Sequence, residues 1–168
     1  QEIFCAKVHL NLKKKYRNSV AIIIPRHIHR ANEIRKDLNK LKLEVHLHSS
    51  KSKIKKNTDI YLVDTFGETN MFIKMCKIVF LGGSISKHGG HNPIEAAREG
   101  CKVIHGPNIS NFKEVYKLMK KYQISSKVND KTKFRSLIIQ SQKKSSFQRN
   151  RIKKLKLLGN KILNKNYK

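Results

Sequence analysis

Short apolar runs rich in β-branched residues alternate along this chain with segments of helical spacing. Residues 20–24 and 78–81 are apolar almost throughout, which is typical of strands buried on both faces of a parallel sheet. Between such runs, apolar residues recur every three or four positions, as at Ile34 and Leu38. This alternation predicts an α/β domain with a doubly wound, Rossmann-like parallel sheet. The five expected strands cover residues 20–24, 43–47, 60–63, 78–81 and 102–104.

The two ends of the chain differ from this alternating middle. Residues 1–16 carry apolar side chains on one helical face and close in a run of lysines, so we expect an interdomain helix there. The Rossmann-like domain is expected to span residues 17–130. Residues 131–168 combine helical spacing with a strongly basic background, which predicts helices that pack on this domain or on a further one. A basic amphipathic helix on a membrane surface is the alternative for that segment.

The charge balance is the strongest compositional signal. Lys and Arg number 38 against 11 Asp and Glu, which gives a formal net charge of +27. A field of this size attracts polyanions, anionic lipid headgroups and phosphorylated ligands. Lysine greatly outnumbers arginine, so the codon bias of an AT-rich genome is a second explanation. No nucleic-acid partner is expected, because no stretch interleaves basic and aromatic residues.

The cysteine pattern and the hydropathy exclude several classes of protein. The three cysteines are widely spaced and lack a C-x-x-C pair, so neither a disulfide framework nor a zinc site is indicated. No apolar run approaches the roughly 20 residues that span a bilayer, and the first residues lack the pattern of a signal peptide. We expect a globular domain in a reducing compartment, without a metal ion.

The densest cluster of special residues follows the fourth expected strand, from Gly82 to Glu95. Asn92 suits a helix N-cap, Pro93 the first helical position and Glu95 the third, so a helix is expected to begin within two residues of Asn92. Glycines ahead of a helix let backbone N–H groups approach an anion. This segment predicts a cradle for a phosphate or a sugar phosphate. Alternatively, the glycines only make the turn and Glu95 only caps its helix.

Polar residues also follow the other expected strands. Arg26 comes after the first strand and can neutralise a phosphate, whereas Gly67 and Glu68 come after the third. Asn108 and Asn111 follow the fifth, as possible caps of the next helix. Ligands of parallel sheets bind beyond the carboxyl ends of the strands, so these loops predict a nucleotide-type pocket.

The motifs in these loops resemble the C-terminal, donor-nucleotide domain of 3-deoxy-D-manno-octulosonic-acid (Kdo) transferase. Order and spacing agree over roughly residues 1–120. The segments that carry the resemblance are 25–27 with Arg30, 64–68, 80–84, 89–95, 106–107 and 111–112, and the Gly-Gly-His-Asn-Pro-Ile-Glu run at 89–95 is the most specific of them.

The resemblance implies a glycosyltransferase B fold, in which this domain binds CMP-Kdo for lipopolysaccharide biosynthesis. The acceptor, a lipid A precursor, the membrane anchor and the catalytic base would belong to an N-terminal domain, so the 168 residues alone would be inactive. No cofactor is implied. The enzyme would work at the cytoplasmic face of the inner membrane, on an anionic membrane surface. The residues implied to contact CMP-Kdo are Arg26, His27, Gly67, Glu68, Gly82, Gly83, Ser84, Gly90, His91, Asn92 and Glu95.

Two other functions remain compatible with the residues. A transferase domain of the same fold that uses a UDP-sugar would share the Gly-rich loop and the strand-end polar residues. A basic nucleotide- or nucleic-acid-binding module without catalysis would share the charge. Affinities for CMP, UMP and UDP, together with salt-sensitive binding of nucleic acid, would distinguish these functions.

Overall fold

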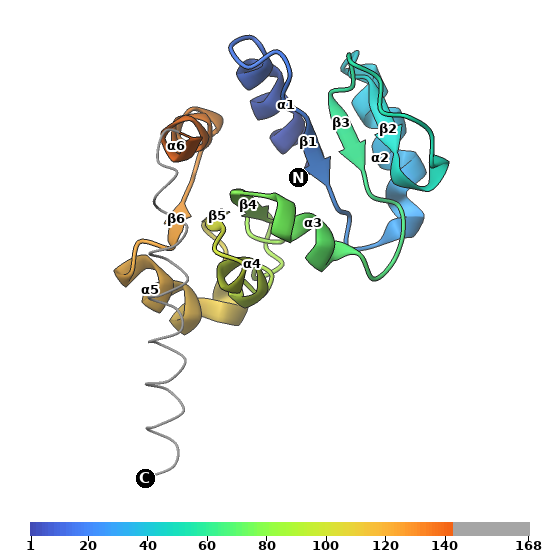
Figure 1. Cartoon of the computed structure of the whole chain (residues 1–168). Coiled ribbons are helices and arrows are strands. Elements are labelled where there is room, and N and C mark those ends of the chain that lie inside the picture. The colour runs from blue at the N-terminus through green and yellow to red at the C-terminus, as the bar shows by residue number, and fades with distance from the viewer. Residues whose placement is uncertain (143–168) are drawn as a thin grey trace. The chain divides into compact units, whose positions relative to one another are not determined.

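The computed structural model describes residues 1–142 and has the expected α/β architecture with parallel strand pairing (Figure 1). The expected helices beyond residue 142 lie outside the described residues. The elements are α1 (Glu2–Lys13), β1 (Ala21–Ile23), the 3-10 turn η1 (Ile28–Arg30), α2 (Ala31–Lys40), β2 (Val45–Leu47), η2 (His48–Ser50), β3 (Ile60–Leu62), α3 (Thr69–Met75), β4 (Ile78–Leu81), α4 (Ile94–Arg98), β5 (Lys102–His105), η3 (Ser110–Phe112), α5 (Lys113–Lys121), β6 (Ser125–Lys127) and α6 (Lys131–Gln142).

The chain divides into two compact units, the first from Gln1 to Phe72 and the second from Ile73 onward. Each has its own three-stranded sheet, in the order β1-β3-β2 in the first unit and β4-β5-β6 in the second. The strands pair in parallel as predicted, but they form two separate sheets instead of one. The strands of each unit pair only with one another, and each unit has its own buried apolar cluster.

In the first unit, β3 is the central strand and its side chains point alternately to the two faces of the sheet. Ile60 and Leu62 are fully buried on one face, where they join Ile34 and Leu38 of α2 in a core that α1 also enters. Helical spacing thus brings one stripe of α2 onto the sheet. Tyr61, between those two strand residues, lies on the opposite face, which is described below with the site.

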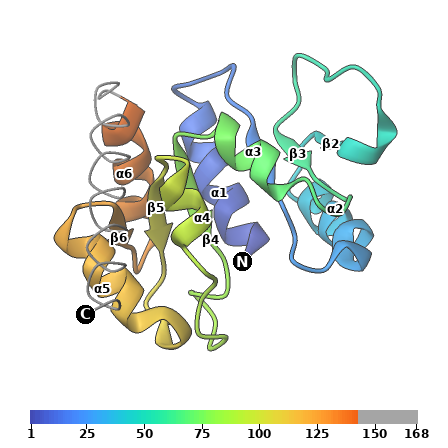
Figure 2. The same ribbon diagram turned by 60° about the horizontal axis from the view of Figure 1, so that its bottom comes forward.

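In the second unit, β5 is the central strand and lies beside β6 (Figures 1 and 2). Val103 belongs to a core with Tyr116 and Met119 of α5, and α4 contributes to the same core. Phe80 of β4 instead contacts Phe134 of α6, with 4.9 Å between the ring centroids. Helices therefore cover both faces of this sheet, which is the doubly wound arrangement that the sequence predicts.

The apolar pattern does not reveal β6. Its residues are Ser-Ser-Lys, which have low hydrophobicity and no alternation, yet they pair in parallel with β5 over Val103 to His105. An edge strand is held by backbone hydrogen bonds to a single neighbour, so its own side chains need not be apolar. The five strands that the sequence predicts all occur, within about two residues of their expected bounds.

Candidate functional site

The loop after β4, residues 82–92, folds back on itself through left-handed glycines. Gly83, Gly89 and Gly90 have φ angles of +71°, +77° and +79°. The Gly90 amide donates to the Gly83 carbonyl at 3.0 Å, which closes the loop. A side chain at Gly83 would place its Cβ 3.1 Å from the His91 ring. The left-handed backbone favours glycine at all three positions, and at Gly83 the nearby His91 ring also leaves little room for a side chain.

The segment after β5 locks this loop in place. Ser84 is fully buried, and its hydroxyl accepts a hydrogen bond from the Gly106 amide at 2.8 Å. The Ser84 carbonyl accepts from the Asn108 amide, also at 2.8 Å. Asn111 continues the contact, since its amide donates to the Gly89 carbonyl at 3.1 Å. The loops at the carboxyl ends of β4 and β5 thus form one hydrogen-bonded body.

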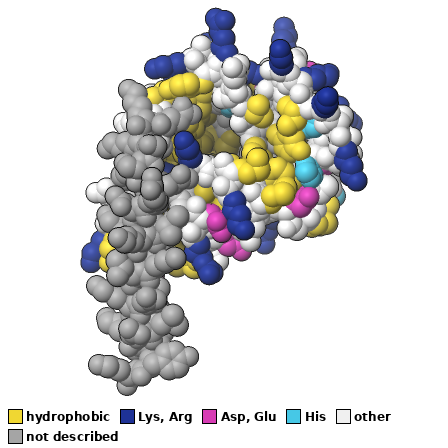
Figure 3. Space-filling model, in the orientation of Figure 1, with side chains coloured by type: hydrophobic (Ala, Val, Ile, Leu, Met, Phe, Trp, Pro, Cys, Tyr) yellow, Lys and Arg dark blue, Asp and Glu magenta, His cyan; other side chains and the backbone are white. Residues whose placement is uncertain are grey.

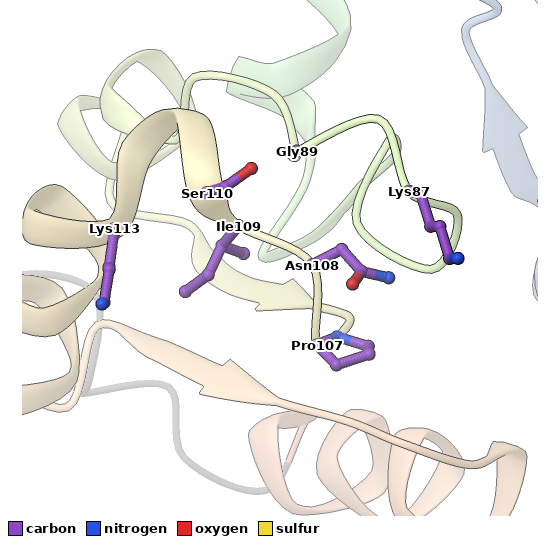
Figure 4. Close-up of a pocket in the computed structure, with 7 residues that line it drawn as sticks. All are labelled: Lys87, Gly89, Pro107, Asn108, Ile109, Ser110 and Lys113. Carbon is purple, nitrogen blue, oxygen red and sulfur yellow. The ribbon is translucent and has the colours of Figure 1, made fainter.

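A pocket of about 450 Å³ opens on this body (Figure 4). Figure 4 shows Lys87 and Lys113 on opposite sides of the group of lining residues, each with its amine reaching out from the backbone. Two lysines and the Ser110 hydroxyl offer hydrogen-bond donors and positive charge to an anionic ligand. The lining residues are Lys87, Gly89, Pro107, Asn108, Ile109, Ser110 and Lys113.

The sequence predicts a nucleotide-type pocket at these strand ends, but none of the lining residues is among those expected to contact CMP-Kdo. Asn108 and Asn111 are expected there only as possible helix caps, although their position after a strand end was a signal for the pocket. In the structure their backbone and side-chain amides bond across to the loop after β4. The candidate residues of that loop, such as Gly90 and Ser84, shape the body on which the pocket opens rather than line it.

The helix after this loop begins at Ile94, two residues after Asn92, as expected. Its details differ from the expected pattern by one position: Pro93 is the N-cap residue, and the Asn92 side chain accepts from the Ile94 amide at 3.0 Å. Glu95 is therefore the second residue of α4 and does not have the spacing of a capping box. It is exposed in the first turn of the helix.

His91 contributes its backbone to the same body. The Tyr116 hydroxyl of α5 donates to the His91 carbonyl at 3.1 Å. The Tyr116 ring lies 4.3 Å from the ring of His105, and burial raises the pKa of the Tyr116 phenol. The buried, neutral Tyr116 hydroxyl thus anchors α5, which starts beside the pocket, to the Gly-rich loop.

Four of the predicted residues lie in the first unit, at the carboxyl ends of β1 and β3. Arg26 and His27 are exposed in the turn after β1. Gly67 has a φ of +83°, and nothing stands within 4 Å of the place a Cβ would occupy. The predicted residues therefore form two groups, one in each unit.

Glu68 is the one carboxylate in the group of predicted residues of the first unit, and two side chains hold it in place. Its Oε2 accepts hydrogen bonds from the Thr65 hydroxyl and from Nε2 of His48, the latter at 3.0 Å. The Thr65 bond, followed by the His48 bond, lowers the pKa of Glu68 below its usual value. Glu68 is therefore an ionised hydrogen-bond acceptor at neutral pH.

Asp64, close by in sequence, is held by the loop after β2. Its carboxylate accepts from the Ser49 amide at 2.8 Å and from the Ser49 hydroxyl. Burial would raise the pKa of Asp64, but the hydrogen bonds from Ser49 outweigh it and the pKa is lowered. Asp64 thus ties the end of β3 to the loop after the neighbouring strand β2.

Residues 1–142 show neither a metal cluster nor a membrane-spanning helix. No group of three or more His, Cys, Asp or Glu side chains in this range is arranged to hold a metal ion. Within the same range, no helix has the length and apolar character needed to cross a membrane. On the face shown in Figure 3, Lys and Arg side chains stand apart from one another rather than in one continuous patch.

Comparison with known proteins gives a consistent set of relatives, although no family model matches the chain. The chain is 35% identical over 123 residues to 3-deoxy-D-manno-octulosonic acid transferase of Haemophilus influenzae, covering 73% of this chain and 29% of that protein. It is 40% identical over 114 residues to the probable mitochondrial enzyme of the same name in Arabidopsis thaliana, covering 67% of this chain and 26% of that protein. It is 38% identical over 110 residues to the Rickettsia prowazekii enzyme, covering 64% of this chain and 23% of that protein.

The structure is similar to a solved one. The C-terminal CMP-Kdo binding domain of WaaA from Acinetobacter baumannii superposes with a TM-score of 0.82 at 22% identity, over 90% of this chain and 79% of that one. This likeness shows a shared fold and confirms the expected fold class. The chain spans about a quarter of the length of the curated relatives that it matches.

Proposed function

This chain is related to the Kdo transferases, and we propose that it is the donor-binding part of such an enzyme, belonging to a glycosyltransferase B fold. In this proposal it holds CMP-Kdo while Kdo is transferred to a lipid A precursor in lipopolysaccharide biosynthesis. The acceptor and the catalytic base are assigned to parts of the enzyme outside these 168 residues.

One observation carries the proposal most directly: the pocket on the interlocked loops after β4 and β5. CMP-Kdo carries a phosphate and a carboxylate, and Lys87 and Lys113 supply positive charge on opposite sides of the pocket. Ligands of parallel sheets bind at this edge. Cations fixed near the phosphate would also stabilise the negative charge that develops on the departing CMP.

The predicted residues take different roles in this proposal. Glu95, exposed at the start of α4, accepts hydrogen bonds from the ribose hydroxyls, and Arg26 neutralises a phosphate. Ser84 acts through the shape of the loop, because its hydroxyl is buried. The full set assigned to the donor is Arg26, His27, Gly67, Glu68, Gly82, Gly83, Ser84, Gly90, His91, Asn92 and Glu95.

Calorimetric titration with CMP, UMP and UDP tests the proposal, and we expect CMP to bind most tightly. Lys113→Gln should weaken CMP binding about three- to fivefold, as the loss of one partly solvated charge contact predicts. Lys117→Gln is the control, because Lys117 is also exposed on α5 but does not line the pocket. Preference for UDP would indicate a UDP-sugar enzyme. Salt-sensitive binding of RNA or DNA in place of CMP would indicate a nucleic-acid-binding module.

We further propose that the net charge of +27 holds the enzyme on the anionic cytoplasmic face of the inner membrane. Each cation near such a surface contributes about 1 kcal/mol. In sedimentation, vesicles with 30% phosphatidylglycerol (roughly the content that gives a strong surface potential) should retain several times more protein than phosphatidylcholine vesicles, and high salt should abolish the difference. Equal retention by both kinds of vesicle would leave codon bias as the explanation of the lysines.

A further inference from the structure

The face of the first sheet opposite its core carries a group of aromatic and titratable side chains. Tyr61 of β3 stacks on His46 of β2, with ring centroids 5.1 Å apart. His48, the first residue after β2, places its ring edge against Phe72 of α3, with centroids 5.3 Å apart. Packing against these rings fixes the plane of the His48 imidazole.

Both nitrogens of the His48 ring are engaged. Nδ1 lies 2.6 Å from the Tyr61 hydroxyl, and Nε2 lies 3.0 Å from Oε2 of Glu68. A neutral imidazole satisfies both partners in one tautomer, in which Tyr61 donates to Nδ1 and Nε2–H donates to Glu68. The ionised Glu68 carboxylate can only accept, so it selects the tautomer with the proton on Nε2, and Nδ1 is left to accept from the Tyr61 hydroxyl.

These bonds leave one side of the Glu68 carboxylate open. Thr65 and His48 both donate to Oε2, and among the described residues none donates to Oε1. The Glu68 side chain is 35% exposed, and it follows Gly67, where a Cβ would meet nothing within 4 Å. The Glu68 carboxylate thus lies partly exposed at the carboxyl edge of the sheet, where a ligand of this fold would lie, with Oε1 able to accept a further hydrogen bond.

We propose that His48 is a positioning residue: backed by Tyr61, it holds Glu68 in one orientation so that Oε1 accepts a hydrogen bond from a hydroxyl of the sugar in the donor. The identity of that ligand rests on the proposed function. The role of His48 toward Glu68 rests on the distances alone.

The first test needs no ligand. In ¹³C NMR titrations of the whole chain, His48→Phe removes both ring nitrogens and keeps an aromatic ring against Phe72, so the pKa of Glu68 should rise toward the ordinary value. Glu2 is the internal control: burial raises its pKa, but hydrogen bonds from its own backbone amide and from the chain N-terminus, with Arg30 nearby, lower it more, and His48 has no part in this balance. An unchanged Glu68 pKa with a native spectrum would overturn the positioning role.

The second test compares binding of CMP with binding of freshly prepared CMP-Kdo. His48→Phe and Glu68→Gln should each weaken CMP-Kdo binding about fivefold and leave CMP binding unchanged, whereas His48→Gln, which keeps a donor, should recover part of the loss. Equal losses for both compounds, or none for either, would contradict the assignment of a sugar hydroxyl. A wild-type chain that binds neither compound would contradict the proposed function, while the pKa of Glu68 still decides the role of His48.

Discussion

Gly106→Ala should destabilise the second unit by about 2–4 kcal/mol and abolish CMP binding at the pocket. A Cβ on Gly106 would lie 2.3 Å from the Ser84 carbonyl oxygen and 2.6 Å from its carbon. These are backbone atoms, which cannot rotate away as a side chain can, so the strand end or the loop must move. Movement would also break the bond from the Gly106 amide to the buried Ser84 hydroxyl. Urea unfolding followed by circular dichroism measures the loss.

Gly67→Ala is the matched control for this prediction. Gly67 has a left-handed φ of +83° but open space around the new Cβ, so the variant should lose only about 1 kcal/mol from backbone strain. Gly106 presents the opposite case, with a steric contact and no left-handed φ. If the two variants lost the same stability, close packing of the loops after β4 and β5 would not be what holds the pocket.

Glu95→Gln should weaken CMP binding roughly 5- to 30-fold, about 1–2 kcal/mol, with little change in melting temperature. The physical reason is that a carboxylate forms stronger, charge-assisted hydrogen bonds with ribose hydroxyls than an amide does. Glu95 is exposed and lies in the first turn of α4, where its charge alone contributes only a few tenths of a kcal/mol to about 1 kcal/mol. Calorimetry with CMP, beside a thermal melt of each variant, separates the two effects.

Glu99→Gln serves as the control for Glu95, since Glu99 is the C-cap residue of the same helix. It should leave CMP affinity unchanged. Unchanged affinity in Glu95→Gln, together with a lowered melting temperature, would mean that Glu95 only stabilises its helix.

Local patterns in the sequence determined most of the elements. The apolar run at 78–81 became β4 with the same bounds, and the stripe through Ile34 and Leu38 became the buried face of α2. The start of α4 near Asn92 followed from the capping preferences of two or three adjacent residues. Each of these features depends on neighbours within a turn or a strand, so the order of residues suffices to predict it.

The tertiary structure alone decided which loops meet and which side chains hold one another. Asn108 and Asn111 looked like helix caps, yet their amides bond to a loop some twenty residues earlier, because β4 and β5 are parallel neighbours and end at the same edge. The contact of His48 with Glu68 likewise joins the ends of β2 and β3. β6, with the sequence Ser-Ser-Lys, is recognisable as a strand only by its parallel pairing with β5. Hydrogen bonds between distant segments depend on strand order, which no local period encodes.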